Sequence, residues 1–259
     1  MLEPRLRLAI NTMAVSIWRI LEGNSPSIYL YGSVTAEDYR HGWSDIDLLV
    51  LTADPLTESQ AEALVHLRQE LCAADPDTPH YRLFEGGITD LGSFLTGEES
   101  RAVYWGTTGQ RITGQHALTA FDRASLLQTG RLLLGRDVRR HIEAPDFPAI
   151  QAAIAAHLTA IEAHGRGTRS IYAFGWLLDI ARCMYTLVNG RLTTKTSAAQ
   201  WALDQRLTPC PEELAMALAV RRQPELIREE SVLDYAEGLT EAIQTCARVL
   251  RGALTASEG

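Results

Sequence analysis

The sequence predicts an α/β domain with a mixed sheet, followed by an all-α helical bundle. In the first half, short segments rich in β-branched and aromatic residues alternate with segments whose apolar residues recur every three or four positions. From Phe147 onward, the helical period continues through successive segments separated by turns. We therefore expect a first domain over residues 1–147 and a helical domain over residues 148–259.

The same patterns give the order of the elements. In the first domain we expect a helix over 4–22, strands over 27–31 and 45–51, a helix over 57–74, a strand over 80–89, and short strands with loops over 100–147. In the second domain we expect helices over 149–164, 169–189, 196–206, 211–221 and 231–253.

Composition narrows the functional classes. Of the 259 residues, 46% are hydrophobic and 22% are charged, which is enough apolar material for ordinary buried cores. The 32 Asp and Glu residues exceed the 24 Lys and Arg residues by 8, which argues against non-specific binding of nucleic acid. We expect a cationic or neutral small-molecule partner, no nucleic-acid partner, and a monomer.

Cysteine spacing and the N-terminus indicate the compartment. Cys72, Cys183, Cys210 and Cys246 lie far apart and form neither a disulfide framework nor a zinc motif, so we interpret them as buried thiols. Charged residues interrupt the apolar N-terminus, unlike a signal peptide, and no stretch approaches the roughly 20 apolar residues of a membrane span. We expect a cytoplasmic protein without a membrane partner.

Two short motifs lie where neighbouring predicted strands end and begin. Gly32-Ser33 follows the strand over 27–31, and Asp45-Ile-Asp47 opens the next strand, with eleven residues between Ser33 and Asp45. Gly32 allows close approach of the backbone to a phosphate, and Ser33 offers a hydroxyl and an amide. Asp45 and Asp47 point to one face of the strand and would repel each other without a cation between them.

Magnesium supplies such a cation. It takes oxygen ligands and keeps water and substrate phosphates in its shell, so paired aspartates beside a phosphate-binding turn predict a two-metal phosphoryl-transfer site. Taken alone, Asp45 and Asp47 would be a solvated strand end, and Gly32-Ser33 an ordinary turn. The combination favours the functional interpretation.

At these residues the sequence resembles the nucleotidyltransferase superfamily of the DNA polymerase β type, whose signature is an apolar residue, Gly, Gly or Ser, a spacer, and Asp-apolar-Asp. The wider chain is similar to the aminoglycoside O-adenylyltransferases of the streptomycin/spectinomycin (3'')(9) group, through Ala181-Arg182, Gly190 and the segment 195–202. The resemblance implies an enzyme that uses ATP and two Mg²⁺ ions to transfer AMP to a hydroxyl of streptomycin or spectinomycin, releasing pyrophosphate and conferring resistance.

The resemblance also implies a third carboxylate, which takes the proton from the attacking hydroxyl and shares a metal. The matching residue is Glu85, and Asp90 is the alternative. The family continues this strand with β-branched residues, whereas this chain has Gly86-Gly87. An exposed Glu85 on an edge strand is the structural alternative.

For the nucleotide, Lys195 matches the lysine of the family's helical domain, in a chain with very few lysines. Its ammonium and the amides of the helix that follows are expected to face the triphosphate. A solvated loop lysine is the alternative. Tyr235 is expected either to stack on adenine or to lie on the buried face of the last helix.

For the drug, Asp179 and Arg182 stand out in an otherwise apolar helix. They either pair with each other, or Asp179 binds a cationic group of the drug while Trp176 supports a ring. Trp105 is a second candidate wall for a sugar ring, with a core position as the alternative. Two other functions remain: AMP transfer to a protein hydroxyl, as in nucleotidyltransferase-type antitoxins, and a non-catalytic nucleotide-binding module.

Overall fold

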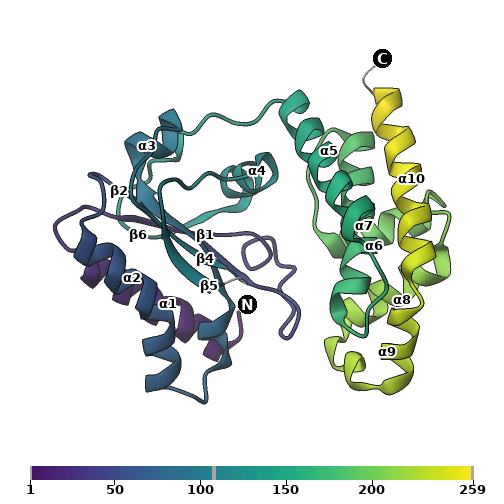
Figure 1. Cartoon of the computed structure of the whole chain (residues 1–259), viewed down its shortest axis with the longest axis horizontal. Helices are drawn as coiled ribbons and strands as arrows, with labels where there is room; N and C mark the ends of the chain where they lie inside the picture. Colours follow the sequence, from purple (N-terminus) through teal and green to yellow (C-terminus); the bar gives the residue numbers. More distant parts are fainter. Residues whose placement is uncertain (1, 107–108, 258–259) are drawn as a thin grey trace. The chain divides into compact units, whose positions relative to one another are not determined.

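The N-terminal half of the chain builds one six-stranded sheet in the order β5-β4-β3-β2-β1-β6 (Figure 1). The computed structural model describes residues 2–106 and 109–257. The strands are β1 (Ser27–Tyr31), β2 (Ile46–Thr52), β3 (Phe84–Asp90), β4 (Ala102–Gly106), β5 (Gly109–Thr113) and β6 (Arg131–Leu134). β2 pairs with β3 in parallel and with β1 in antiparallel, so the sheet is mixed, as predicted.

Helices cover the two faces of this sheet. α1 (Pro4–Ile20) and α2 (Glu58–Ala74) lie against each other on one face, where the indole of Trp105 on β4 reaches Leu64 of α2. α3 (Leu91–Thr96) and α4 (Ala120–Thr129) lie on the other face (Figure 1). The core there contains Tyr31 and Leu49 of the central strands together with Phe94 of α3 and Leu126 of α4.

Three local features differ from the predicted elements. The strand expected from residue 80 begins at Phe84, because Pro79–Leu83 forms a 3-10 turn. α3 was not expected; the Asp90 side chain caps it by accepting from the Ser93 amide. α4 was also not expected, and Thr119 caps it through the Asp122 amide.

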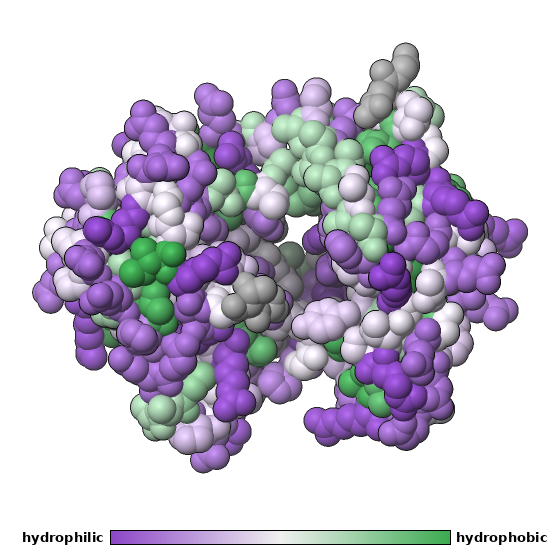
Figure 2. Space-filling view, in the orientation of Figure 1, coloured by the Kyte–Doolittle hydropathy of each residue, from purple (hydrophilic) through white to green (hydrophobic). Residues whose placement is uncertain are grey.

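The second unit is a helical bundle. Its helices are α5 (Phe147–His164), α6 (Ile171–Asn189), α7 (Lys195–Asp204), α8 (Pro211–Arg222), α9 (Glu230–Glu237) and α10 (Thr240–Ser257). The single helix expected over 231–253 is divided into α9 and α10 at Gly238. On the face shown in Figure 2, hydrophilic residues cover most of this unit, and weakly apolar residues gather over α5.

α6 is the central helix of the bundle and packs against α5, α7, α8, α9 and α10. Contrary to the expectation that no segment qualifies, its 19 residues are long and apolar enough to cross a membrane by length and composition. Half of the qualifying stretch is buried within the protein, which is also typical of the core helix of a bundle. Length and composition alone therefore do not assign it to a membrane.

The two compact units divide the chain in an unexpected way. The first comprises Met1–Glu37 and Asp45–Ala144, and the second comprises Asp38–Ser44 and Pro145–Gly259. The sequence predicted a single boundary at residue 147. Residues 38–44, which we call the connector, join the motif Gly32-Ser33 to Asp45 but pack with the helical unit.

Candidate active site

The turn after β1 lies directly against the Asp47 carboxylate. Gly32 has φ +72, and a Cβ built on it would lie 1.9 Å from Oδ2 of Asp47. The Ser33 hydroxyl donates to the backbone carbonyl of Asp45 at 3.5 Å. The structure thus brings together the turn and the paired aspartates, and only glycine allows the backbone to approach the carboxylate this closely.

Glu85 lies beside Asp47 in the sheet. Asp47 is the register partner of Tyr31 on β1 and of Glu85 on β3. Side chains of directly paired residues project from the same face, so the two carboxylates share the face that carries α3 and α4. Both side chains are half-buried.

The two glycines after Glu85 have separate steric reasons. Gly86 has φ +141, and a Cβ there would lie 1.8 Å from the Leu48 carbonyl oxygen. A Cβ on Gly87 would lie 2.1 Å from the ring of His116. The departure from the family pattern therefore accommodates close packing of β2 and of an imidazole, and the register of Glu85 against Asp47 is maintained.

Asp90 occupies the opposite end of β3. It lies five positions after Glu85, about 17 Å along the strand at roughly 3.3 Å per residue. It pairs with Thr52 in the sheet, is buried, and caps α3. Burial alone would raise its pKa, but hydrogen bonds from Ser100 and Ser93 lower the pKa overall. The geometry gives Asp90 a structural role.

Two residues that the sequence analysis did not select border the acidic group. Burial, followed by the charge of Asp47, raises the pKa of Tyr31 well above its usual value, so its phenol stays protonated at neutral pH. Arg68 donates to the Phe84 carbonyl at 2.7 Å, and burial lowers its pKa while the charge of Glu85 opposes that effect. The helical period of α2 gave no signal for Arg68, because its partner is a backbone carbonyl on β3.

The donor set at the turn fits a hard cation. Asp45 and Asp47 are carboxylates, and the magnesium coordination shell is usually completed by water and substrate phosphates rather than by further side chains. Within residues 2–106 and 109–257, no three His, Cys, Asp or Glu side chains form a ready-made metal cluster. These two carboxylates are a donor set of the kind that magnesium takes from a protein.

In the helical unit, the predicted residues Lys195 and Asp179 bind each other. The Lys195 ammonium lies 3.0 Å from Oδ1 and 3.1 Å from Oδ2 of Asp179. Nη2 of Arg182 lies 3.3 Å from Oδ1, and Nε2 of His157 lies 3.8 Å from Oδ2. Burial alone would raise the pKa of Asp179, but Lys195 and these neighbours outweigh it and hold the pKa well below its usual range.

Of the two alternatives for Asp179, the structure shows the one in which it pairs with Arg182. Its side chain is 13% exposed and already faces the ammonium of Lys195 and the guanidinium of Arg182, so it does not offer a free charge to a cationic drug. His157 was missed by the sequence analysis. Its sequence signal was weak, because α5 also carries the polar residues Gln151, Thr159, Glu162 and His164.

The three aromatic candidates occupy different environments. Trp105 is corrected to a core residue, because it is 2% exposed and its indole N–H donates to the Leu64 carbonyl at 3.0 Å. Trp176 is half-buried beside His157, with 6.2 Å between ring centroids. Tyr235 belongs to α9, is 37% exposed, and stacks on Phe174 at 6.5 Å.

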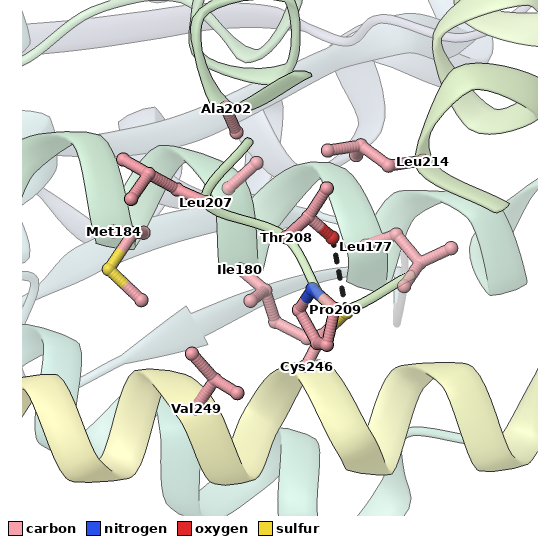
Figure 3. A pocket seen from close by; sticks show the side chains of 11 residues that line it. Leu177, Ile180, Met184, Ala202, Leu207, Thr208, Pro209, Leu214, Cys246 and Val249 are labelled. Atoms are coloured by element: carbon pink, nitrogen blue, oxygen red, sulfur yellow. Dashed lines mark hydrogen bonds between the residues drawn. The ribbon is translucent and has the colours of Figure 1, made fainter. Parts of the chain in front are cut away.

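A pocket within the helical unit lies among α6, α7, α8 and α10 (Figure 3). It encloses about 330 Å³, part of it open to solvent, and its lining is mainly aliphatic, including Leu177, Ile180, Met184 and Val249. Figure 3 shows Thr208 and Cys246 in contact at one side of it. A lining with so few polar groups does not suit a polyhydroxylated, cationic ligand.

Comparisons with known proteins agree with the fold. Residues 16–87, which include the turn, both aspartates and Glu85, match the nucleotidyltransferase domain family. The first unit is therefore a nucleotidyltransferase domain. Residues 143–250 match the C-terminal domain of aminoglycoside adenylyltransferases. The chain belongs to the aminoglycoside adenylyltransferase family.

A solved structure shows the same fold along nearly the whole chain. It is the spectinomycin adenyltransferase AAD(9) from Enterococcus faecialis, crystallised with ATP and spectinomycin. The TM-score is 0.64, and the match covers 96% of this chain and 99% of that chain. Sequence identity is 16%, so this likeness establishes the fold.

Proposed function

We propose that this protein transfers AMP from ATP to a hydroxyl of a cationic aminoglycoside or aminocyclitol antibiotic, with spectinomycin and streptomycin as the first candidates. The observation that carries the proposal is the position of Asp47, which lies between the Gly32 turn on β1 and Glu85 on β3. The family supports the adenylyl transfer, and the ligands of the similar spectinomycin adenyltransferase support this choice of substrates.

The proposed reaction is an in-line displacement at the α-phosphorus of ATP. The drug hydroxyl oxygen forms a bond to that phosphorus, the bond to the bridging oxygen of the β-phosphate breaks, and pyrophosphate leaves. Glu85 accepts the proton of the attacking hydroxyl. Glu85 lies directly across the parallel strand pair from Asp47.

Asp45 and Asp47 would hold Mg²⁺, which supplies charge neutralisation and orientation of the triphosphate. The amide and hydroxyl of Ser33 would bind a phosphate oxygen at the turn. We assign Lys195 to the β- and γ-phosphates, and Asp179 to holding the Lys195 ammonium in place. Lys195 is the only lysine in the sequence, so this assignment can be tested with lysine-specific chemistry.

On the acceptor side, Trp176 is the remaining aromatic candidate for contact with a drug ring, and Tyr235 is the candidate for stacking on adenine. Both rings keep part of their surface exposed. The excess of 8 negative charges on the chain favours the approach of a cationic acceptor.

The test is incubation of the purified protein with ATP and magnesium in the presence of spectinomycin, streptomycin or kanamycin in turn. We expect one adenylyl group on spectinomycin or streptomycin by mass spectrometry, with pyrophosphate release that depends on the drug. AMP attached to protein, with no modified drug, would instead support the antitoxin-like function. Tight ATP binding without any transfer would support a nucleotide-binding module.

A further inference from the structure

We propose that Arg221 is a positioning residue for the nucleotide-binding turn, because it holds the connector through a buried ion pair with Asp38. The inference rests on the proposed function and adds to it a residue on α8, distant in sequence from both motifs. The ligand whose binding it would affect is a magnesium-bound nucleoside triphosphate.

The ion pair is almost completely buried. Nη2 of Arg221 lies 2.7 Å from Oδ2 of Asp38 and also donates to the Asp38 backbone carbonyl at 3.0 Å. The two side chains are 3% and 6% exposed. Arg221 lies on the apolar face of α8, one or two turns after the buried residues Leu214, Ala217 and Leu218.

The same carboxylate also meets the start of α7. Asp38 accepts from the backbone amide of Thr196 at 3.4 Å and from the Thr196 hydroxyl. Nε of Arg221 donates to that hydroxyl at 3.1 Å, which closes the network. The first turn of α7 therefore binds a carboxylate of the protein itself, although we had expected its amides to face a triphosphate.

The connector is ordered around this anchor. The Arg221 guanidinium lies 5.5 Å from the centre of the Trp43 ring. The Arg40 amide donates to the Ser44 hydroxyl at 3.0 Å, and the Ser44 amide donates to the Arg40 carbonyl at 2.8 Å. This closed loop ends at Ser44, immediately before Asp45.

Backbone strain marks the other end of the connector. Ala36 is hydrogen-bonded to the turn, since its amide donates to the Gly32 carbonyl at 3.1 Å. Glu37 then adopts φ +60, a left-handed conformation that costs a non-glycine residue free energy, and Asp38 enters its buried network. Such a conformation persists only where neighbouring contacts impose it, and the Asp38 network supplies them.

A buried ion pair is a weak source of stability, because desolvation offsets most of the attraction. Replacing both partners with apolar residues of similar size is often tolerated, whereas removing one partner leaves an unpaired buried charge. An exclusively stabilising role for Asp38 and Arg221 therefore predicts a functional double variant. A positioning role predicts a double variant that folds but has a less ordered connector and impaired kinetics.

The experiment compares wild type, the double variant Asp38→Leu/Arg221→Met, and the control Arg222→Met. Arg222 is exposed, lies on the same helix, and donates to Gln200 at 2.9 Å. We expect the double variant to keep its melting temperature within a few degrees. Its amides over residues 39–45 should exchange faster with deuterium, and its KM for ATP or its turnover should worsen by about tenfold or more. Arg222→Met should match wild type in every measurement.

Wild-type exchange over residues 39–45 together with wild-type kinetics in the double variant would overturn the proposal. If the double variant does not fold, Arg221→Lys replaces it, since the charge is kept and the fork that bonds both Asp38 and Thr196 is lost. The exchange measurement requires no drug. It therefore tests the inference even if the wild type transfers no AMP, which would be a failure of the proposed function alone.

Discussion

Asp47 on β2 and Glu85 on β3 are direct partners in the parallel pairing of the two central strands. The pairing places both carboxylates on one face of the sheet. On that face, the phenol of Tyr31, which is the partner of Asp47 on β1, stays protonated at neutral pH. On the other side of Asp47, the Gly32 backbone leaves no space for a side chain. This arrangement predicts different consequences for substitutions at neighbouring positions.

Gly32→Ala should abolish most adenylyl transfer. Its Cβ would lie 1.9 Å from Oδ2 of Asp47, so the carboxylate or the turn must move. Gly23 also has a positive φ, of +91, but a Cβ there would meet nothing within 4 Å. Gly23→Ala should therefore cost about 1 to 2 kcal/mol of backbone strain and keep its turnover. Thermal unfolding and drug adenylation measure the two effects, and equal activity of both variants would refute the close-approach argument.

Glu85→Gln should bind ATP normally and lose about 100- to 10,000-fold in turnover, because the amide cannot accept the hydroxyl proton. Asp90→Ala is the comparison, since Asp90 caps α3. It should cost about 1 kcal/mol in unfolding free energy and retain turnover. Steady-state kinetics with urea unfolding separates these effects. The reverse pattern, with Asp90→Ala inactive and Glu85→Gln active, would reassign the base.

The sequence predicted the elements of the acidic site because its signals are local. A glycine turn and an acid on a strand carry their geometry in the strand period, and the Asp47 carboxylate lies against Gly32. The environment of Trp105 could not be predicted in this way, since a tryptophan in a short strand has the same sequence pattern whether it faces a helix or a ligand. The ion pair of Arg221 could not be predicted either, because its partner Asp38 lies 183 positions away and only the fold brings the two together.

Asp179→Asn should make the free energy of unfolding less sensitive to a fall in pH below about 4. The folded-state pKa of Asp179 is depressed, so its contribution is fully present above the unfolded pKa of about 4 and is lost as pH falls through the folded value. At pH 7 the substitution should cost about 3 kcal/mol, since Lys195 and Arg182 lose their anion. Urea unfolding at pH 7, 4 and 3 should show the gap from wild type narrowing, and a constant gap would contradict the role of the carboxylate charge.

Trp105→Phe and Trp176→Phe should behave differently. The first removes the indole bond to the buried Leu64 carbonyl, so we expect a loss of about 1 to 3 kcal/mol in stability and an unchanged KM for the drug. The second should raise the KM for the drug about tenfold, equivalent to about 1.4 kcal/mol, with little change in stability. Drug titrations of both variants at fixed ATP provide the check. A drug KM that changes only in Trp105→Phe would reverse the two assignments.

The most direct test of the account is the turnover of Asp47→Asn, a substitution that preserves the shape of the side chain against Gly32 and removes its charge. With ATP, magnesium and the drug that the wild type modifies, we expect wild-type circular dichroism and melting temperature and at least about 100-fold less adenylylated drug by mass spectrometry. Wild-type turnover in a correctly folded Asp47→Asn protein would contradict the assignment of this carboxylate to the reaction.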